Sequence, residues 1–219
     1  MVDSVGRSAS VQKARTHLHD ADPVLARLID ARPDFDPHAW IAQLPPMDLY
    51  GALLFQIVGQ QLSVAATRRT LERIQALFSS HLPSPAELLA VDPGSLRQAG
   101  LSWRKIGTLR DLAERLSDGR LDVDALSGMP DDDFIAALTA ISGIGPWTAQ
   151  GALLIALQRE DVVLPGDLAL RKAMQRAYQL DHLPDQQEVV AIAEKWWPYR
   201  SLATSYLFAS AYDGTDASP

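Results

Sequence analysis

The amino-acid sequence predicts an all-α fold, and two observations support this prediction. Apolar residues recur at intervals of three and four along most of the 219 residues, as they do on the buried face of an amphipathic helix. Runs that alternate apolar and polar residues, which are typical of half-buried strands, are absent. The segment DVVLPG at 161–166 is the only candidate strand, and it is short enough to be an extended connector. We therefore expect about nine or ten helices and no β-sheet.

The predicted helices follow one another through short connections that contain proline, glycine, serine or aspartate, which interrupt helices. These connections are PSPAE from 83, DPGS from 92, SGMPDDD from 127 and LPDQQE from 183. We expect a helical region over 21–212, with flexible termini at 1–20 and 213–219. The clearest helical spacing is found in four sets of residues: Leu49, Leu53, Leu54, Ile57, Val58 and Leu62; Leu71, Ile74, Leu77 and Phe78; Leu109, Leu112 and Leu116; and Phe134, Ile135, Leu138 and Ile141.

Composition excludes several classes of protein. The chain has no cysteine, which rules out disulfides, thiolate zinc sites, iron–sulfur clusters and a cysteine nucleophile. No run of eighteen apolar residues occurs, and the first twenty residues contain no apolar segment. Neither a membrane span nor a secretory signal is therefore predicted, and we expect a cytoplasmic protein with no membrane partner.

The charge balance argues against a protein that coats nucleic acid through bulk charge. Twenty basic residues face 27 acidic ones, a net charge of −7. The cations are nevertheless clustered, and each cluster is either a solvated helix face or a local basic contact surface. The clusters are Arg68 with Arg69, Arg104 and Lys105 with Arg110, and Arg171 and Lys172 with Arg176.

The segment ISGIGP at 141–146 predicts a tight connection between two helices. A helix that ends near Ala140 would meet Gly143, and a second helix would begin at Pro146, because the first helical turn tolerates proline. Glycines at 143 and 145 leave the backbone bare, and amides at the start of a helix bind anions such as phosphate. The alternative is a plain turn between helices. The apolar residues on both sides favour an anion-binding hairpin over 133–157.

Five segments, in order along the chain, form a recognisable set. They are an early helix with a Gln-Gln pair, LYGALLFQIVGQQLSVAATRRTLERI; an AGLS turn in LRQAGLSWRKIGTLRDLA; the hairpin LTAISGIGPWTAQGALLIAL; a Gly/Pro loop, VVLPGDLALRKA; and the closing AEKWWPYRSLATSYLF. Together they resemble the helix-hairpin-helix (HhH-GPD) superfamily of DNA glycosylases, and the last of them resembles its alkylpurine branch, the 3-methyladenine DNA glycosylase II group. The resemblance covers the chain from about Ala21 to Tyr212.

The resemblance implies an all-α protein of two interleaved helical subdomains with an active-site cleft between them, in a minimal form without an N-terminal β domain. It also implies a base excision repair enzyme that flips out alkylated purines and hydrolyses their N-glycosidic bond. Asp167 matches the catalytic carboxylate of the superfamily. Taken by itself, an aspartate before LALRKA is an N-cap, and the two roles are compatible.

The resemblance also assigns the residues that would enter the helix stack of DNA. Gln61, the second residue of the Gln-Gln pair, matches the position that inserts a side chain into the gap left by the flipped base. Leu62 is the alternative wedge, although its spacing with the preceding apolar residues assigns it to the core.

Aromatic residues are expected to line the base pocket. Trp147 stands where bifunctional relatives have a lysine, so no Schiff base and no strand cleavage are expected. An indole there suits a positively charged methylated purine. Tyr199 stands where a tryptophan is usual, and Tyr50 is a third candidate. We expect Trp196 and Trp197 to pack inside the fold.

The expected partner is double-stranded DNA that contains alkylated bases, bound by a monomer. No cofactor is expected to be required, but the resemblance implies a structural Na⁺ or K⁺ held at the hairpin by the backbone carbonyls of Thr139, Ile141 and Ile144. The residues expected to contact the DNA backbone are Gly143, Ile144, Gly145, Thr148, Arg104, Lys105 and Arg171.

Two alternatives remain open on the residues alone. The enzyme could act on an oxidised or deaminated base, although Trp147 and the WWPYRS ending weigh against this. A non-catalytic DNA-binding module could also use the hairpin, but such a module has no need of Asp167.

Overall fold

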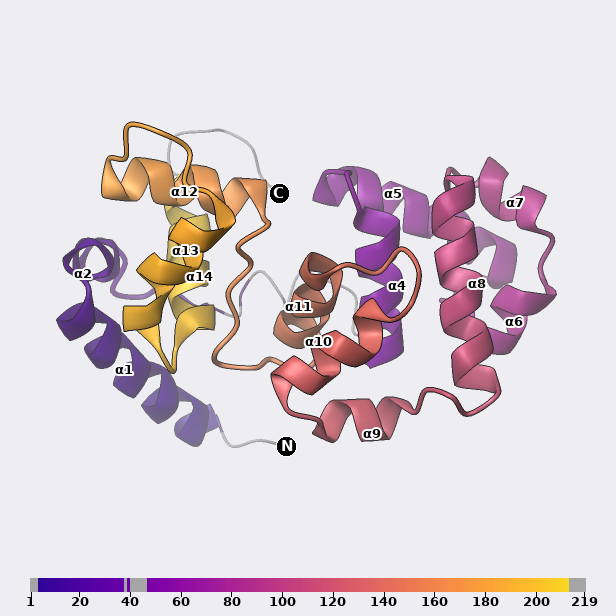
Figure 1. The fold of residues 1–219 in the computed structure, drawn as a ribbon, viewed down its shortest axis with the longest axis horizontal. Coiled ribbons are helices and arrows are strands. Elements are labelled where there is room, and N and C mark those ends of the chain that lie inside the picture. The colour runs from indigo at the N-terminus through magenta and orange to yellow at the C-terminus, as the bar shows by residue number, and fades with distance from the viewer. Residues whose placement is uncertain (1–3, 38, 40–46, 213–219) are drawn as a thin grey trace. The chain divides into compact units, whose positions relative to one another are not determined.

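The computed structural model describes residues 4–37, 39 and 47–212, which contain thirteen α-helices, two short 3₁₀ helices and no strand (Figure 1). The predicted all-α fold is confirmed. The segment 161–166 is an extended connector that ends in a turn, as expected. The chain divides into two units, in which unit 1 comprises residues 1–45 and 158–218 and unit 2 comprises residues 46–157.

Unit 1 is built from both ends of the chain. Its helices are α1 (Ser4–Ala21), α2 (Pro23–Asp30), α12 (Leu168–Tyr178), α13 (Gln186–Ala193), the 3₁₀ helix η2 (Glu194–Trp196) and α14 (Arg200–Tyr212). Helix α12 packs against α14, and α1 packs against α2. The expectation that residues 1–20 are flexible is wrong for residues 4–20, which belong to α1, and this helix buries Ala14 and Leu18. Two buried residues are too few to produce a visible helical pattern. The expected flexible segment 213–219 lies outside the described residues.

Asp22 holds the parts of unit 1 together. Its carboxylate is fully buried, caps α2 through the Val24 amide at 2.8 Å, and accepts hydrogen bonds from the Tyr178 hydroxyl and from Trp196 Nε1 at 2.8 Å. The Lys195 ammonium lies 3.2 Å from the same carboxylate. Burial by itself would raise the pKa of Asp22, but the hydrogen bonds outweigh it and hold the pKa below its usual value. This buried carboxylate therefore joins α2, α12 and η2.

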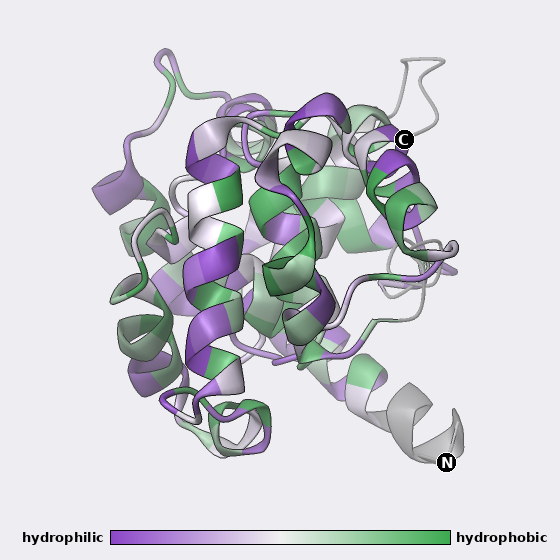
Figure 2. Cartoon of the chain, turned by 90° about the vertical axis from the view of Figure 1, so that its right-hand side faces the viewer, coloured by the Kyte–Doolittle hydropathy of each residue, from purple (hydrophilic) through white to green (hydrophobic). Residues whose placement is uncertain are grey.

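Unit 2 is organised around one buried helix. Its elements are α4 (Leu49–Gly59), α5 (Val64–Gln75), η1 (Ala76–Phe78), α6 (Pro85–Ala90), α7 (Pro93–Gln98), α8 (Trp103–Ser117), α9 (Val123–Gly128), α10 (Asp131–Thr139) and α11 (Pro146–Ile155). Every residue of α4 from Leu49 to Val58 is buried, and α4 contacts α5, α8, α9 and α11. Figure 2 shows hydrophilic and hydrophobic residues interspersed along the helices that face the viewer, as amphipathic helices require.

Short helices account for the difference between the nine or ten expected and the larger number found in the described residues. Helices α6, α7 and α9 have six residues each and begin after the capping residues Ser84, Asp92 and Asp122. Their serine, aspartate and proline residues predicted interruptions, whereas here the same residues start a new helix. Six residues are too few for helical periodicity to be recognised.

No single helix in the described ranges is long and apolar enough to cross a membrane. Only Leu49–Gly59 and Val64–Phe78 taken together, across a bend of 116°, reach that length and composition.

Candidate active site

The hairpin lies where the sequence predicts it. Helix α10 ends at Thr139 and α11 begins at Pro146. The turn between them is anchored by two buried isoleucines, Ile141 and Ile144, which are 1% and 4% exposed. The Ile144 amide donates to the Ile141 carbonyl at 3.1 Å. The apolar residues of this motif therefore fix the turn from inside.

The two glycines of the turn have different structural roles. Gly143 has a φ of 90°, and a Cβ there would lie 2.0 Å from Thr108 Oγ1 on α8. Gly145 caps α11 with a φ of −102°, and a Cβ there would meet nothing within 4 Å. The described residues provide no hydrogen-bond acceptor for the amide of Gly143 or for that of Gly145. Both amides can donate to an anion, but only Gly143 is also required for packing.

Gln60, the first residue of the Gln-Gln pair, joins α4 to the hairpin. Its Nε2 donates to the Gly143 carbonyl at 3.0 Å and to Thr148 Oγ1 at 3.1 Å. Thr148 is 2% exposed and its amide donates to the Gly145 carbonyl, so this residue faces inward rather than toward the DNA backbone as expected. The Ile144 amide is likewise used within the turn.

Gln61 is turned away from the protein. Helix α4 ends at Gly59, Gln61 adopts a φ of 60°, and Ser63 caps α5. We call residues 60–63 the wedge turn. Gln61 is exposed and Leu62 is 43% exposed, so the assignment of Leu62 to the core is wrong. The helical spacing that suggested it does not continue past Gly59, because the chain reverses there.

Lys105 stabilises the wedge turn from α8. Its ammonium donates to the Val58 carbonyl at 2.7 Å and to the Gln60 carbonyl at 2.8 Å, at the end of α4 where helical carbonyls lack partners. Burial lowers the pKa of Lys105. Lys105 therefore has a helix-capping role, and the expected phosphate contact of this residue stays a prediction. Arg104, one residue earlier, is exposed and remains available for such a contact.

Asp167, in unit 1, is held at the start of α12. Its Oδ1 accepts a hydrogen bond from the Leu170 amide at 2.8 Å, and its own amide donates to the Leu164 carbonyl at 3.0 Å. The side chain is half-buried, and the next residue, Leu168, is 52% exposed. The N-cap role inferred from the sequence is thus present. It fixes the orientation of this half-buried carboxylate.

Hydrogen bonds and an ion pair hold the segment that leads to Asp167 against the start of α14. The Ser201 amide donates to the Glu160 carbonyl at 3.0 Å, and its hydroxyl donates to the Arg159 carbonyl at 2.6 Å and accepts from the Val162 amide at 3.0 Å. Arg200 binds both carboxylate oxygens of Asp161, at 2.7 and 2.5 Å. Two parallel hydrogen bonds of this kind fix the orientation of the guanidinium relative to the carboxylate. These contacts hold residues 159–162 in place before the turn at Asp167.

The other expected site residues of unit 1 have clear environments. Arg171 uses Nε to donate to the Pro184 carbonyl at 2.6 Å, so this part of the guanidinium is not available to phosphate. The half-buried ring of Tyr199 packs against His17 edge-on, with centroids 5.4 Å apart. Trp196 is fully buried, as expected, but Trp197 is 64% exposed and does not pack inside the fold.

Two aromatic candidates belong to unit 2. Trp147 is the second residue of α11 and is half-buried. Tyr50 is 9% exposed on α4, and its hydroxyl has no hydrogen-bond partner among the described residues. Burial, with the charges of Asp48 and Glu87, raises the pKa of this tyrosine. Tyr50 is therefore mainly a packing residue of unit 2, and a pocket role for it stays a prediction.

The hairpin carbonyls are compatible with the expected monovalent cation. The carbonyls of Thr139 and Ile144 accept no hydrogen bond within the described part of the chain, and that of Ile141 accepts one, from Ile144. A carbonyl oxygen has two lone pairs, so all three can coordinate a hard cation.

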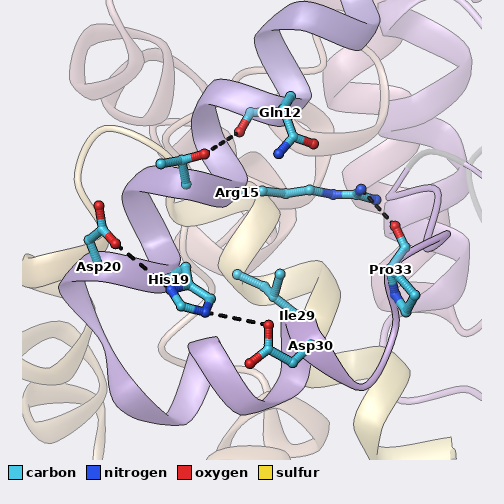
Figure 3. Close-up of a pocket in the computed structure, with 8 residues that line it drawn as sticks. Gln12, Arg15, His19, Asp20, Ile29, Asp30 and Pro33 are labelled. Atoms are coloured by element: carbon cyan, nitrogen blue, oxygen red, sulfur yellow. Dashed lines mark hydrogen bonds and ion pairs between the residues drawn. The ribbon is translucent and has the colours of Figure 1, made fainter.

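A cavity of about 420 Å³ between α1 and α2 differs from the expected base pocket (Figure 3). The described residues that line it include no phenylalanine, tyrosine or tryptophan. Its charged groups bond within unit 1: Arg15 Nη1 donates to the Pro33 carbonyl at 2.8 Å, and His19 Nε2 lies 3.4 Å from Asp30 Oδ1. The cavity therefore lacks the tryptophan and tyrosine side chains that are expected to line the base pocket.

Comparison with known proteins is consistent with these features. The profile described as HhH-GPD superfamily base excision DNA repair protein matches residues 55–199. DNA-3-methyladenine glycosylase 1 of Schizosaccharomyces pombe is 28% identical over 204 residues, which is 92% of this chain and 88% of the relative. YfjP of Bacillus subtilis is 30% identical over 182 residues, which is 80% of this chain but only 63% of the relative.

Solved structures agree with the sequence comparison. The 3-methyladenine DNA glycosylase (Mag1) of S. pombe in complex with abasic DNA superimposes with a TM-score of 0.84 at 27% identity, over 94% of this chain and 100% of that chain. A DNA-3-methyladenine glycosidase from Bacillus halodurans gives a TM-score of 0.67 at 32% identity, over 87% and 89%. The chain belongs to the HhH-GPD superfamily of base excision DNA repair proteins.

Proposed function

We propose that this protein is a monofunctional DNA glycosylase that removes alkylated purines, such as 3-methyladenine and 7-methylguanine, from double-stranded DNA. The observation that carries the proposal is the carboxylate of Asp167, which the Leu170 amide holds at the exposed start of α12. The N-cap role alone would suit any helical protein, but a module that only binds DNA has no need of a carboxylate near the scissile sugar, which is the position that the resemblance gives to Asp167. The names of the relatives support alkylated bases as the substrate class.

The role of Asp167 follows from the charge that develops in the reaction. As the bond between C1′ and the base nitrogen breaks, its electrons leave with the base and positive charge grows on the sugar. A carboxylate near C1′ stabilises that charge, and water then adds to C1′ and loses a proton. Because the Leu170 amide already orients the Asp167 carboxylate, little reorganisation is needed.

Gln61 would fill the space that the flipped nucleotide leaves. The wedge turn presents this side chain to solvent, while hydrogen bonds from the Lys105 ammonium to the Gln60 carbonyl and from the Gln60 side chain to the Gly143 carbonyl fix the residue before it. The backbone that carries an inserted side chain must be rigid, because a mobile segment would lose conformational entropy on insertion. The exposed Leu62 next to it can add apolar contact.

Trp147 and Tyr199 would provide the aromatic surfaces that stack on the base. Methylation at N3 or N7 gives the purine a positive charge, and the face of an indole attracts a cation by about 0.5–2 kcal/mol. The same charge makes the base a good leaving group. No lysine stands at position 147, so base release without strand cleavage is expected.

The hairpin would hold the DNA backbone. The amides of Gly143 and Gly145 donate to phosphate, and a Na⁺ or K⁺ bound to the carbonyls of Thr139, Ile141 and Ile144 would neutralise phosphate charge there. These local contacts would allow a chain of net charge −7 to bind DNA. We expect a monomer that acts on the chromosome in the cytoplasm.

Incubation with alkylated DNA tests the proposal. The protein should release 3-methyladenine and 7-methylguanine, identified by chromatography, and leave an abasic strand that breaks only after hot alkali. Borohydride should trap no covalent complex. Release of an oxidised or deaminated base instead would change the substrate class, and DNA binding without release of any base would contradict the enzyme assignment. A trapped adduct that disappears in Lys172→Ala would contradict the monofunctional assignment.

A further inference from the structure

Gln56 is a buried polar residue whose side-chain amide is not used inside the protein. It lies on α4, is 7% exposed, and forms no side-chain hydrogen bond within the described part of the chain. Neither atom of the amide is completely enclosed, so a bound molecule can reach it. A buried amide without a partner destabilises a folded protein, and buried polar groups are therefore normally hydrogen-bonded. A ligand can supply the partners that Gln56 lacks.

The Gln56 amide lies directly over Gly151. Helices α4 and α11 lie side by side in unit 2 (Figure 1). A Cβ at Gly151 would lie 2.4 Å from Gln56 Nε2 and 2.9 Å from Gln56 Oε1, separations that real Cβ atoms do not show. Any side chain at position 151 would therefore displace the amide, and the glycine leaves space for it between the two helices.

The packing of α4 on α11 places the Gln56 amide one helical turn from Trp147. Gln60, at the C-cap of α4, donates to Thr148 Oγ1 at 3.1 Å. Four residues earlier on α4, the Gln56 amide meets Gly151, three residues later on α11. Gly151 follows Trp147 by four residues, and residues at this spacing share a helix face with Cβ positions about 5–6 Å apart. The free amide thus lies beside the indole to which base stacking is assigned above.

The chemistry of a side-chain amide suits adenine. A glutamine accepts a hydrogen bond from the 6-amino group of adenine and donates one to the ring nitrogen beside it. In 3-methyladenine, both ring nitrogens beside the amino group, N1 and N7, are unmethylated, so two edges of the base can form this pair. In 7-methylguanine, O6 lies between N1, which carries a hydrogen, and the methylated N7, so only one edge can form two hydrogen bonds.

We propose that Gln56 is a specificity-determining residue that hydrogen-bonds to the flipped base and favours alkylated adenine over alkylated guanine. The inference rests on the proposed function, because it requires a flipped base beside Trp147. Oε1 accepts from the 6-amino group and Nε2 donates to the adjacent ring nitrogen, while the indole covers the face of the same base. The positive charge of the methylated adenine makes its amino group a stronger donor. A site that hydrogen-bonds its substrate discriminates against a base that leaves the polar group unpaired.

Release of two bases from one DNA sample tests the proposal. Duplex DNA treated with a methylating agent contains 3-methyladenine and 7-methylguanine together, and chromatography measures both in the same reaction. With enzyme in excess, Gln56→Met should release 3-methyladenine about tenfold more slowly than the wild type and 7-methylguanine within about twofold of it. Methionine fills a similar volume without an amide, so packing over Gly151 should persist. A general loss of folded enzyme would slow both bases equally.

Gln75→Met is the matched control. Gln75 is half-buried at the end of α5 in the same unit, and the same substitution there should leave the release of both bases unchanged. Thermal unfolding without DNA gives a second measurement. Gln56→Met should be at least as stable as the wild type, because it removes a buried amide that has no partner.

Three results would overturn the inference. Gln56→Met could release both bases at wild-type rates, could slow both equally, or could be markedly less stable than the wild type, which would mean that the amide is bonded inside the protein. The stability measurement is independent of base release. A wild type that releases neither base contradicts the proposed function and this inference with it, whereas an active wild type whose Gln56→Met variant keeps the same ratio of the two release rates contradicts only this inference.

Discussion

Gln60 Nε2 donates to the Gly143 carbonyl at 3.0 Å, and this bond joins α4 to the turn of the hairpin. The same amide group donates to the buried Thr148 hydroxyl at 3.1 Å. Gln61, the next residue, has a φ of 60° and an exposed side chain. Two identical neighbours thus differ in environment, one bonded inside the protein and one exposed to solvent.

Replacement of these two glutamines should therefore give opposite phenotypes. Gln60→Ala leaves two hydrogen-bonding groups without their donor and should lower the free energy of unfolding by about 1–3 kcal/mol. Gln61→Ala removes a solvent-exposed side chain and should change it by less than about 0.5 kcal/mol, yet slow base release. Urea unfolding and single-turnover excision measure the two effects. Equal excision by Gln61→Ala and the wild type would exclude Gln61 as the wedge.

The two hairpin glycines should also be distinguishable. Gly143→Ala should destabilise the protein by about 2 kcal/mol or more, because its Cβ would clash with Thr108 Oγ1 and its φ is positive. Gly145→Ala should fold normally and weaken binding to damaged and undamaged duplexes alike, because the added methyl group obstructs the approach of phosphate.

Thr108 provides the control for this prediction. Thr108→Ala combined with Gly143→Ala removes the hydroxyl that the new Cβ would meet, and it should recover part of the lost stability. Thermal unfolding measures the recovery. No recovery would mean that the positive φ alone accounts for the stability lost in Gly143→Ala. A loss in Gly145→Ala confined to damaged DNA would contradict a backbone contact there.

Asp167→Asn should slow base release at least about a hundredfold, because the neutral amide stabilises the sugar cation poorly. The asparagine still caps α12, so folding and binding to abasic DNA should persist. Asp185→Asn is the matched control, since Asp185 caps α13 by accepting from the Gln187 and Glu188 amides. It should release base at the wild-type rate. Undiminished release by Asp167→Asn would remove the catalytic assignment.

Asp22 should make the stability of unit 1 depend on pH. Its pKa in the folded state lies below the usual 3.8, so the ionised form stabilises the fold above that value. This contribution should be lost as the pH falls from about 3.8 through the folded-state pKa.

Asp22→Asn should lose that part of the pH dependence. At neutral pH it should be about 1–3 kcal/mol less stable, because one buried donor loses its acceptor. Unfolding followed between pH 2 and 7, compared with Asp185→Asn, measures both effects.

The sequence by itself determined the all-α fold, the position of the hairpin turn between Ala140 and Pro146, and the capping position of Asp167. Each of these depends on local physics: the spacing of apolar residues, the tolerance of proline in a first helical turn, and the hydrogen bond that an aspartate accepts from the amide three residues later. The short helices α6, α7 and α9 were missed, because the residues that cap a helix are also those that interrupt one.

Only the tertiary structure decided which of several similar residues faces inward. Gln60 and Gln61, Arg104 and Lys105, and Trp196 and Trp197 are adjacent pairs of similar residues, and in each pair one member is engaged inside the protein while the other is exposed. Which member faces inward depends on where the chain turns and on which carbonyls of a distant element lack partners. Lys105 caps α4 because two unpaired carbonyls lie within reach of its ammonium, at positions 45 and 47 residues away in the sequence. Contacts of that range leave no periodic trace in a single sequence, because they are created only when the helices pack.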